Sequence, residues 1–516
     1  MTAASNYLAI DCGTQSIRAL VFDANGELLV KTQSSLGEYQ SPQPGWSEQA
    51  PEFFWQQLAG VCQQLWSEVD PASISGVALT TQRATMINLD RHQQPLRPAI
   101  SWLDQRQAQR TPSLPLLDSL LKVVGKSEPL NRLKREAESN WIAEHQPQVH
   151  QQTEHYLLLS AYLNFRLTGQ CHDAIASQVG YIPFDYKALN WASKSSWRYT
   201  ALSLRREQMP ELFPAGTRLG RVNTAAAQST GLPEGVPVFA AGSDKACEVL
   251  GSGCIDSSCG AISYGTTATF NVNSAKYFEA LPFQPAYPAV VPGHYNVETM
   301  VHRGYWMVNW FKKEFGLREE QIAAERDIAP ETLFDDLLRQ VPAGSMGLVL
   351  QPYWSSGANS EGPEAKGAMI GFGDVHTRAH IYRAIIEGIG YALREGKERL
   401  EKRGKLKFER LRVSGGGSQS DEILQITANL FNLPVERPHT YETSGLGAAM
   451  AVAVGTGRYD SFEQAAKAMI RFKDRFEPQV DQVEIYEKLF QQVYRKLYGQ
   501  LRPSYRAIRR ITGYPS

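Results

Sequence analysis

The sequence predicts an α/β protein made of two related halves, because strands and helices alternate throughout and one strand-and-turn pattern occurs twice. In each half a short apolar strand ends in a Gly-Thr turn, at Gly13-Thr14 and at Gly265-Thr266. The two turns lie close to half of the 516-residue chain apart, which indicates a repeated structural unit. Chance is the alternative, since Gly and Thr are both common in turns.

The first half opens with three expected strands. The later elements are predicted from the spacing of hydrophobic residues and from the turn residues between them. The strands span residues 7–11, 17–22 and 27–35. A helix is expected from Pro51, because proline suits the first helical turn. Further along, the sequence predicts strands at residues 74–80 and 85–89, a helix at 154–167 and a strand at 236–241.

The second half repeats the opening, with a strand, a Gly-Thr turn and a returning strand at residues 261–272. The sequence then predicts a helix at 377–403, a strand at 408–413, and helices at 421–431 and 446–454. We place the domain boundary between residues 255 and 256. Residues 1–255 form the expected N-terminal domain, and residues 256–516 the C-terminal domain with a helical tail.

Composition favours a small-molecule partner. The 53 basic and 53 acidic residues balance, so neither nucleic acid nor an anionic membrane is expected to bind. A basic stretch at residues 494–510 is interpreted as a solvated helix face. No apolar run is long enough to span a membrane, and the six cysteines form no disulfide framework, so a cytoplasmic location is expected. A homodimer is left open.

The first Gly-Thr turn contains the parts that an ATP phosphate site needs. A glycine lets the backbone approach an anion, turn N–H groups and hydroxyls bind phosphate oxygens, and Asp11 can position hydrated Mg²⁺. The candidate phosphate-binding residues are Thr14, Gln15, Ser16 and Arg18 in the first turn and Gly265, Thr266 and Thr267 in the second. Walker and dinucleotide-binding motifs are absent from the sequence. A simple hairpin is the alternative.

Three further segments are candidates for substrate and nucleotide contacts. Asp244 follows an apolar strand and could act as general base or cap the next helix. The triple glycine Gly415, Gly416, Gly417 lies between a strand and a helix, where a nucleotide or a flexible loop would both fit. Candidate substrate-binding residues are Gln82, Arg83, Trp102, Asp104, Asp244 and Lys245.

Taken together, these motifs resemble the FGGY carbohydrate kinases, which include glycerol kinase, xylulokinase and ribulokinase. The resemblance rests on residues 11–18, 81–83, 102–106, 242–244, 265–267 and 415–417, in the family's order. Residues 367–372 and 380–387 fit the family's second signature, except at Phe372, where an aliphatic residue is usual.

The resemblance implies two ribonuclease-H-like domains of the actin type around a nucleotide cleft, with ATP and Mg²⁺ bound between them. It implies Asp244 as the base, Asp11 as the metal carboxylate, and sugar bound mainly by the first domain. Some positions differ from the glycerol kinase pattern: Ala84 stands where glutamate is usual, and Lys245 where glutamine is usual. Glu138 stands where the first signature has lysine.

These departures leave the acceptor open among ketopentoses, pentitols, tetritols and glycerol-like polyols. We interpret Lys245 as a cation that could suit an oxygen-rich or anionic substrate. Two other functions share the two-domain clamp: a nucleotide switch of the actin or Hsp70 type, and a non-catalytic sugar sensor. The retained Asp11, Thr14 and Asp244 favour a kinase.

Overall fold

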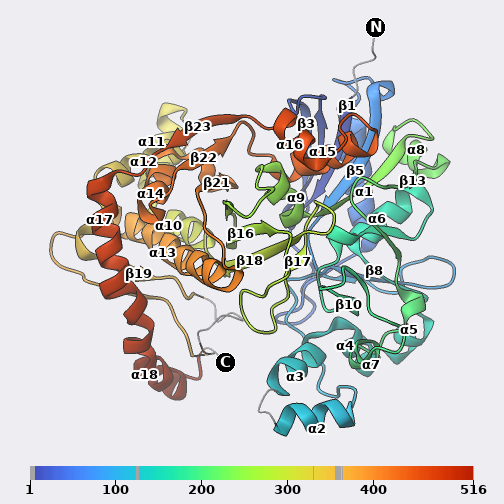
Figure 1. Ribbon diagram of the computed structural model, residues 1–516, viewed down its shortest axis with the longest axis horizontal. Coiled ribbons are helices and arrows are strands. Elements are labelled where there is room, and N and C mark those ends of the chain that lie inside the picture. Colours follow the sequence, from blue (N-terminus) through green and yellow to red (C-terminus); the bar gives the residue numbers. More distant parts are fainter. Residues whose placement is uncertain (1–5, 124–126, 329, 355–361, 363, 515–516) are drawn as a thin grey trace.

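Two mixed β-sheets, one in each half of the chain, form the centres of the computed structural model (Figure 1). The structure describes residues 6–123, 127–328, 330–354, 362 and 364–514. Helices lie on the faces of both sheets (Figure 1). The α/β prediction is confirmed.

The first sheet places its first strand at the centre, between a hairpin on one side and two parallel strands on the other. In spatial order its strands are β13 (Arg218–Arg221), β14 (Pro237–Ser243), β5 (Ile74–Thr81), β1 (Asn6–Cys12), β2 (Ser16–Phe22) and β3 (Leu28–Ser35). β1 is antiparallel to β2 and parallel to β5, and β5 is parallel to β14. The carboxyl ends of β1, β5 and β14 therefore meet at one edge.

The second sheet repeats this arrangement. Its strands, in spatial order, are β17 (Tyr287–Pro288), β18 (Tyr295–Val301), β16 (Ala268–Ser274), β15 (Cys259–Tyr264), β21 (Arg410–Ser414), β22 (Val435–Pro438) and β23 (Phe472–Phe476). β15 is antiparallel to β16 and parallel to β21, as β1 is to β2 and β5. The two Gly-Thr turns thus occupy the same position, between the first two strands of related sheets.

Alternating residues of β1 belong to two different cores, so helices cover both faces of the first sheet. Leu8 and Ile10 pack with α1 (Pro51–Leu65) and α6 (Leu159–Thr168). Tyr7 and Ala9 pack on the other face with α9 (Asp244–Gly251), α15 (Thr443–Gly455) and α16 (Phe462–Met469). Helices α15 and α16 therefore complete the core of the first half although they come late in the second.

Close packing of α15 on α9 depends on glycine. A Cβ added to Gly251 would lie 1.8 Å from the carbonyl oxygen of Thr443, and one added to Gly447 would lie 2.0 Å from that of Cys247. No side chain fits at these distances, so the two helices approach at backbone distance. This crossing joins the two halves through α9, the helix that follows β14 directly.

The helix expected at residues 154–167 is wrong in its first turn. The structure has strand β8 (His155–Leu158), antiparallel to β6 (Met86–Leu89), and α6 begins only at Leu159. A continuous apolar run fits a buried strand and a buried helix equally well, and here a free edge of β6 is available for pairing.

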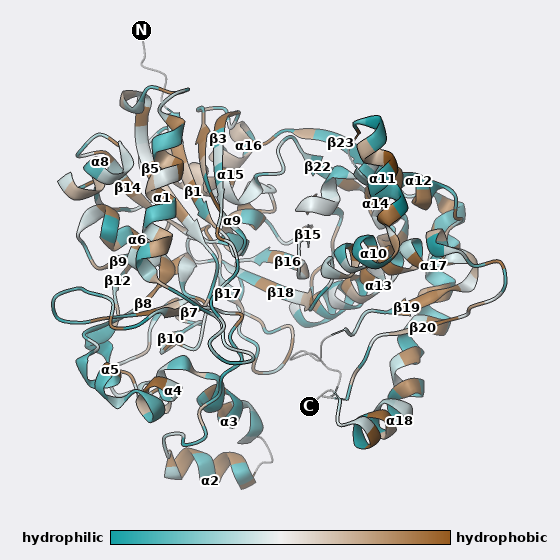
Figure 2. Ribbon diagram, turned by 180° about the vertical axis from the view of Figure 1, so that it is seen from behind, coloured by the Kyte–Doolittle hydropathy of each residue, from teal (hydrophilic) through white to brown (hydrophobic). Residues whose placement is uncertain are grey.

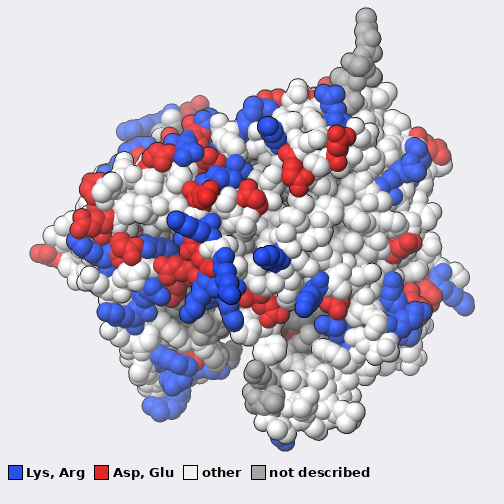
Figure 3. Space-filling model, viewed as in Figure 1, with Lys and Arg blue, Asp and Glu red and all other residues white. Residues whose placement is uncertain are grey.

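Two peripheral parts extend from the sheets. Helices α2 (Pro115–Val123) and α3 (Ser127–Glu136) form a lobe below the first half, and Figure 2 shows apolar bands along α2. Helix α18 (Arg495–Thr512) ends the chain on the other side, and Figure 3 shows a notch between it and the α2–α3 lobe. Basic and acidic side chains are interspersed over that face (Figure 3). Among the described residues, no helix is long and apolar enough to cross a membrane.

Candidate active site

Three neighbouring parallel strands of the first sheet deliver polar residues to one edge. Asp11 lies at the end of β1 opposite Thr80 of β5, and Gln82 follows β5. Ser243, the last residue of β14, lies opposite Thr81, and Asp244 comes next. The sheet topology thus places three sequence-predicted site residues, Asp11, Gln82 and Asp244, side by side.

Asp244 is the first residue of α9 and does not cap that helix. Ser243 is the N-cap, and its hydroxyl accepts the N–H of Ala246. The interpretation of Asp244 as an N-cap is therefore wrong; its Oδ1 accepts the backbone N–H of Lys245 at 2.7 Å, and no hydrogen bond to Oδ2 is recorded in the described structure. About a third of the side chain (31%) is solvent-accessible.

Arg83 lies beside the Asp244 carboxylate and balances its charge. The guanidinium Nε is 4.0 Å from Oδ1 of Asp244, and the ring of Tyr287 lies under the same guanidinium at 5.4 Å. Burial raises the pKa of Asp244, while the charges of Arg83 and Lys245 lower it. A carboxylate with a raised pKa beside a cation is suited to accept a proton.

Asp11 is buried at the end of β1, and one of its oxygens faces no donor in the described structure. Oδ2 accepts a hydrogen bond from Arg18 at 3.4 Å, whereas Oδ1 is buried without a hydrogen-bond partner in the described structure. Burial, opposed by the charge of Arg18 and reinforced by that of Asp244, raises the pKa of Asp11 to about 7. A divalent cation at Oδ1 would satisfy this oxygen and lower the pKa of the carboxyl group.

The residues present fit a Mg²⁺ ion that keeps most of its waters. In the described part of the chain, no group of three or more His, Cys, Asp or Glu side chains could form a closed metal cage. Mg²⁺ commonly binds through one or two carboxylates plus phosphate oxygens and water. Asp11 matches that pattern.

The first Gly-Thr turn contacts two predicted substrate residues. The Thr14 hydroxyl accepts the indole N–H of Trp102 at 2.9 Å and donates to Oε1 of Gln82 at 3.3 Å. Gln82 also contacts the Tyr39 hydroxyl. The phosphate turn and the expected sugar loops are therefore one connected cluster.

The three other predicted phosphate-binding residues of this turn differ in exposure and in their partners. Gln15 is exposed, whereas Ser16 is buried as the first residue of β2. Arg18 donates to Glu442 at 2.7 Å, and Glu442 also accepts from Lys31 at 3.0 Å. Arg18 is thus tied to the second half of the chain while its side chain stays one-third exposed.

Two predicted substrate residues are engaged by other protein groups. The Asp104 carboxylate accepts two hydrogen bonds from the Arg106 guanidinium, at 2.8 and 2.7 Å, one from the Arg106 N–H at 2.9 Å and one from the Ser47 N–H at 2.6 Å. The Lys245 ammonium pairs with Glu248 at 2.5 Å and donates to Ser263 at 2.7 Å. Its positive charge is therefore already balanced by a neighbouring carboxylate.

The second Gly-Thr turn and the triple glycine lie at the ends of adjacent parallel strands. Ser263 of β15 is opposite Ser414 of β21, so the two loops that follow are neighbours. Thr266 is exposed, and Gly265 and Thr267 are half-buried. These groups present a second polar turn at the carboxyl ends of β15 and β21.

Two of the three glycines are required by their surroundings, and the third is open. Gly415 has φ +79°, and a Cβ there would lie 2.9 Å from the backbone of Tyr264. A Cβ on Gly417 would lie 2.5 Å from the Tyr305 hydroxyl. Around Gly416 no atom lies within 4 Å of the Cβ position. The backbone at Gly416 is thus accessible to a ligand.

Three buried glutamates of the site escaped the sequence analysis. Glu248 joins Lys245 to the Ser414 hydroxyl, Glu442 joins Arg18 to Lys31, and Glu298 accepts from Arg83 at 3.3 Å. Only Glu298 had a usable signal, because polar residues alternate with valines along that strand. The other two are recognisable only once the halves are brought together.

Comparison with known proteins decides the family. The model of the FGGY carbohydrate kinase N-terminal domain matches residues 6–251, and that of the C-terminal domain matches residues 260–456. The chain belongs to the FGGY family of carbohydrate kinases. As a member, it is an enzyme that phosphorylates a sugar or polyol with ATP.

Individual FGGY relatives cover nearly the whole chain. A xylulose kinase of Lactococcus lactis is 29% identical over 505 residues, which is 95% of this chain and 96% of that protein. The crystal structure of a xylulose kinase from Lactobacillus acidophilus superposes with a TM-score of 0.81 at 21% identity, covering 97% of this chain and 99% of that one. The ADP-bound glycerol kinase of Plasmodium falciparum gives 0.78 at 19% identity, covering 96% and 98%. These structures have the actin-like fold expected from the sequence.

Proposed function

We propose that the enzyme transfers the γ-phosphoryl group of ATP to a hydroxyl of a small sugar or polyol, with Asp244 as general base. The observation that supports this most is the placement of Asp244. It follows a buried strand, is released from capping by Ser243, has a raised pKa and lies beside Arg83. In the reaction its carboxylate takes the acceptor's hydroxyl proton while that oxygen attacks phosphorus and ADP leaves.

The nucleotide is proposed to lie between the two polar turns. Its phosphates would contact Thr14, Gln15, Ser16 and Arg18 on one side and Gly265, Thr266 and Thr267 on the other. The open backbone at Gly416, between Gly415 and Gly417, would face the nucleoside end. Asp11 would hold Mg²⁺, which neutralises charge on the phosphates when bound. The ADP-bound Plasmodium glycerol kinase supports a nucleotide in this fold.

The acceptor is proposed to lie between Asp244 and the Gln82–Trp102 cluster. Gln82 and Arg83 offer polar contacts, and the Trp102 ring, 44% exposed, offers a face for C–H groups. The relatives named above are xylulose and glycerol kinases, so the class spans ketopentoses, pentitols, tetritols and glycerol-like polyols. Since Glu248 balances Lys245, we favour a neutral acceptor over an anionic one.

A coupled assay of ADP release across these acceptor classes, with Asp244→Asn as the key variant, tests the proposal. We expect turnover with at least one acceptor, and a loss of about 10²-fold or more in kcat for Asp244→Asn. Binding of ATP by the variant, measured by calorimetry, should stay within about threefold of the wild type. Full activity of Asp244→Asn would contradict the assignment of the base.

A further inference from the structure

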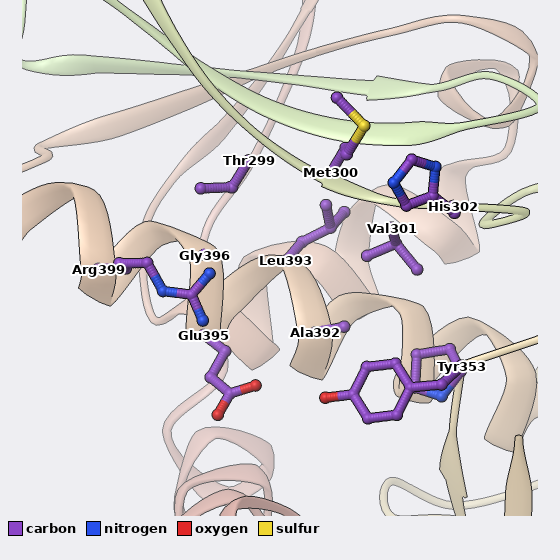
Figure 4. Close-up of a pocket in the computed structure, with 11 residues that line it drawn as sticks. Thr299, Met300, Val301, His302, Tyr353, Ala392, Leu393, Glu395, Gly396 and Arg399 are labelled. Atoms are coloured by element: carbon purple, nitrogen blue, oxygen red, sulfur yellow. The ribbon is translucent and has the colours of Figure 1, made fainter. Parts of the chain in front are cut away.

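The polar face of strand β18 is directed toward the first half of the molecule. Side chains alternate along a strand, and Val297 and Val301 pack in the core of the second half. Figure 4 shows Thr299 and Val301 on the side of β18 that faces α13 (Arg378–Gly404). Asn296 and Glu298 therefore lie on the opposite face, away from α13.

This polar face continues onto the neighbouring strand. Asn271 of β16 lies directly opposite Glu298 in the antiparallel register, so both side chains share one face. Asn296, two residues before Glu298, lies opposite Tyr287 of β17, whose ring is under the Arg83 guanidinium.

Each of these three side chains has a buried oxygen that nothing satisfies. Asn271, Asn296 and Glu298 are 2%, 4% and 3% exposed. Oδ1 of both asparagines and Oε2 of Glu298 have no hydrogen-bond partner in the described structure. Burying acceptors without donors costs free energy, so such a cluster indicates a ligand that brings donors.

Arg83 joins this cluster to the proposed base. Both terminal nitrogens of its guanidinium lie 3.3 Å from Oε1 of Glu298, and its Nε is 4.0 Å from Asp244. One arginine thus spans from the catalytic carboxylate of the first half to Glu298 of the second. The cluster is therefore linked to Asp244 through Arg83.

We propose that Asn271, Asn296 and Glu298 form the second domain's half of the acceptor site and accept hydrogen bonds from hydroxyls remote from the reacting one. This inference rests on the proposed function and narrows its substrate class. Cβ atoms of Asn271 and Glu298 are about 5 Å apart by their register, and Asn296 lies about 7 Å along the strand. Acceptors of four or five carbons reach such a set; glycerol does not reach all of it.

The chemistry of the cluster also selects against charge. All three free atoms are acceptors and one belongs to a carboxylate, so the cluster favours hydroxyl donors over carboxylate or phosphate groups. The pocket between β18 and α13 (Figure 4) is lined by Thr299 and Val301, so it lies on the other face of β18 from the three unsatisfied oxygens. The inferred acceptor is a neutral ketopentose, pentitol or tetritol.

The test compares Glu298→Gln and Asn296→Ala with Glu436→Gln. Glu436 is a buried glutamate of the same sheet that pairs with Arg412 and Arg475, away from this cluster. For the best acceptor of the wild type, we expect KM to rise about tenfold in Glu298→Gln and about fivefold in Asn296→Ala. The ATP KM and the melting temperature should follow the Glu436→Gln control.

The two variants separate binding of the acceptor from a purely structural role of the Arg83–Glu298 ion pair. Asn296 makes no bond to Arg83 in the described structure, so a purely structural Arg83–Glu298 link would leave Asn296→Ala at the wild-type acceptor KM and overturn the inference. Unchanged acceptor KM in Glu298→Gln would also overturn it. Absence of wild-type turnover with every acceptor would overturn the proposed function, and this inference with it.

Discussion

Asp11 and Asp244 are carboxylates at the carboxyl ends of β1 and β14, which both flank β5, and the charge of Asp244 raises the pKa of Asp11. Their partners differ. Asp244 lies beside Arg83, whereas one oxygen of Asp11 lacks any donor. This difference assigns proton transfer to Asp244 and cation binding to Asp11 in our proposal.

Glu138 is a third carboxylate whose surroundings make folding stability depend on pH. Burial raises its pKa from 4.5 to about 8, and its Oε2 is buried without a partner in the described structure. The folded protein therefore retains a proton that the unfolded chain loses above pH 4.5. By linkage, the stabilising contribution is full below pH 4.5 and falls as pH rises toward 8.

Glu138→Gln, which cannot ionise, should remove this dependence. At pH 8.5 we expect the variant to melt about 2–5 °C above the wild type, with the difference vanishing near pH 4. Differential scanning calorimetry across this range measures it. Parallel pH profiles for the two proteins would show that Glu138 ionises normally.

At the residue scale, the sequence predicts the site residues that belong to local motifs. It does not predict those whose partners lie in the other half of the chain. Asp11, Thr14 and Asp244 lie at or just after the end of an apolar strand, and this pattern can be recognised from the sequence alone. Glu248 and Glu442 acquire their role only when paired with Ser414 and Arg18, far away in the chain. Such pairings depend on tertiary contact alone.

The triple-glycine loop is the element where backbone shape and ligand access can be separated. Gly417→Ala would bring Cβ to 2.5 Å from the Tyr305 hydroxyl, whereas Gly416→Ala meets no atom within 4 Å. We expect Gly417→Ala to destabilise the protein by about 1–3 kcal/mol through overpacking. Gly416→Ala should leave stability nearly unchanged.

Both substitutions should raise the KM for ATP: the Gly416→Ala methyl lies where the nucleotide is proposed to approach, and Gly417→Ala forces the loop to shift away from the Tyr305 hydroxyl. Urea unfolding and initial-rate kinetics measure the two effects. An ATP KM at the wild-type value in Gly416→Ala would place the nucleotide elsewhere.

The α9–α15 crossing gives a second prediction for an element. Gly447→Ala would bring Cβ to 2.0 Å from the Cys247 carbonyl oxygen, and the helices must separate. We expect a loss of about 2 kcal/mol or more. Gly60→Ala in α1 is the matched control, since its Cβ meets no atom within 4 Å, and it should stabilise by up to about 1 kcal/mol. Equal melting temperatures for the two variants would contradict the close crossing.

Helices were predicted correctly where the hydrophobic residues follow a helical period and a capping residue marks the first turn. The helix expected at residues 421–431 has the bounds of α14 (Asp421–Phe431), which begins after the capping Ser420. The apolar run at 154–167 lacks such a signal, and strand pairing with β6 decided its first residues. The local sequence therefore predicts the bounds of a capped helix, whereas a continuous apolar run fits a strand and a helix equally well.

At the scale of the whole molecule, the two halves are interlocked by elements and by ion pairs. Helices α15 and α16 complete the first half's core, and Arg18–Glu442 and Arg83–Glu298 cross between the halves. The apolar sequence of α15 predicts tight packing but contains no information on its partner. The domain boundary at residues 255 and 256, a homodimer and a cytoplasmic location stay predictions.

In our proposal one carboxylate base, two polar turns and an acceptor face act together, as phosphoryl transfer to a bound hydroxyl requires. In our proposal the phosphoryl group passes directly from ATP to the acceptor oxygen while Asp244 takes the proton of that hydroxyl. The most direct measurement is mass spectrometry of the acceptor after incubation with γ-¹⁸O-labelled ATP, for wild type and Asp244→Asn, with ADP counted in parallel. We expect one labelled phosphoryl group on the acceptor for each ADP released by the wild type, and almost none with Asp244→Asn. ADP release with only free phosphate and an unmodified acceptor would contradict the account.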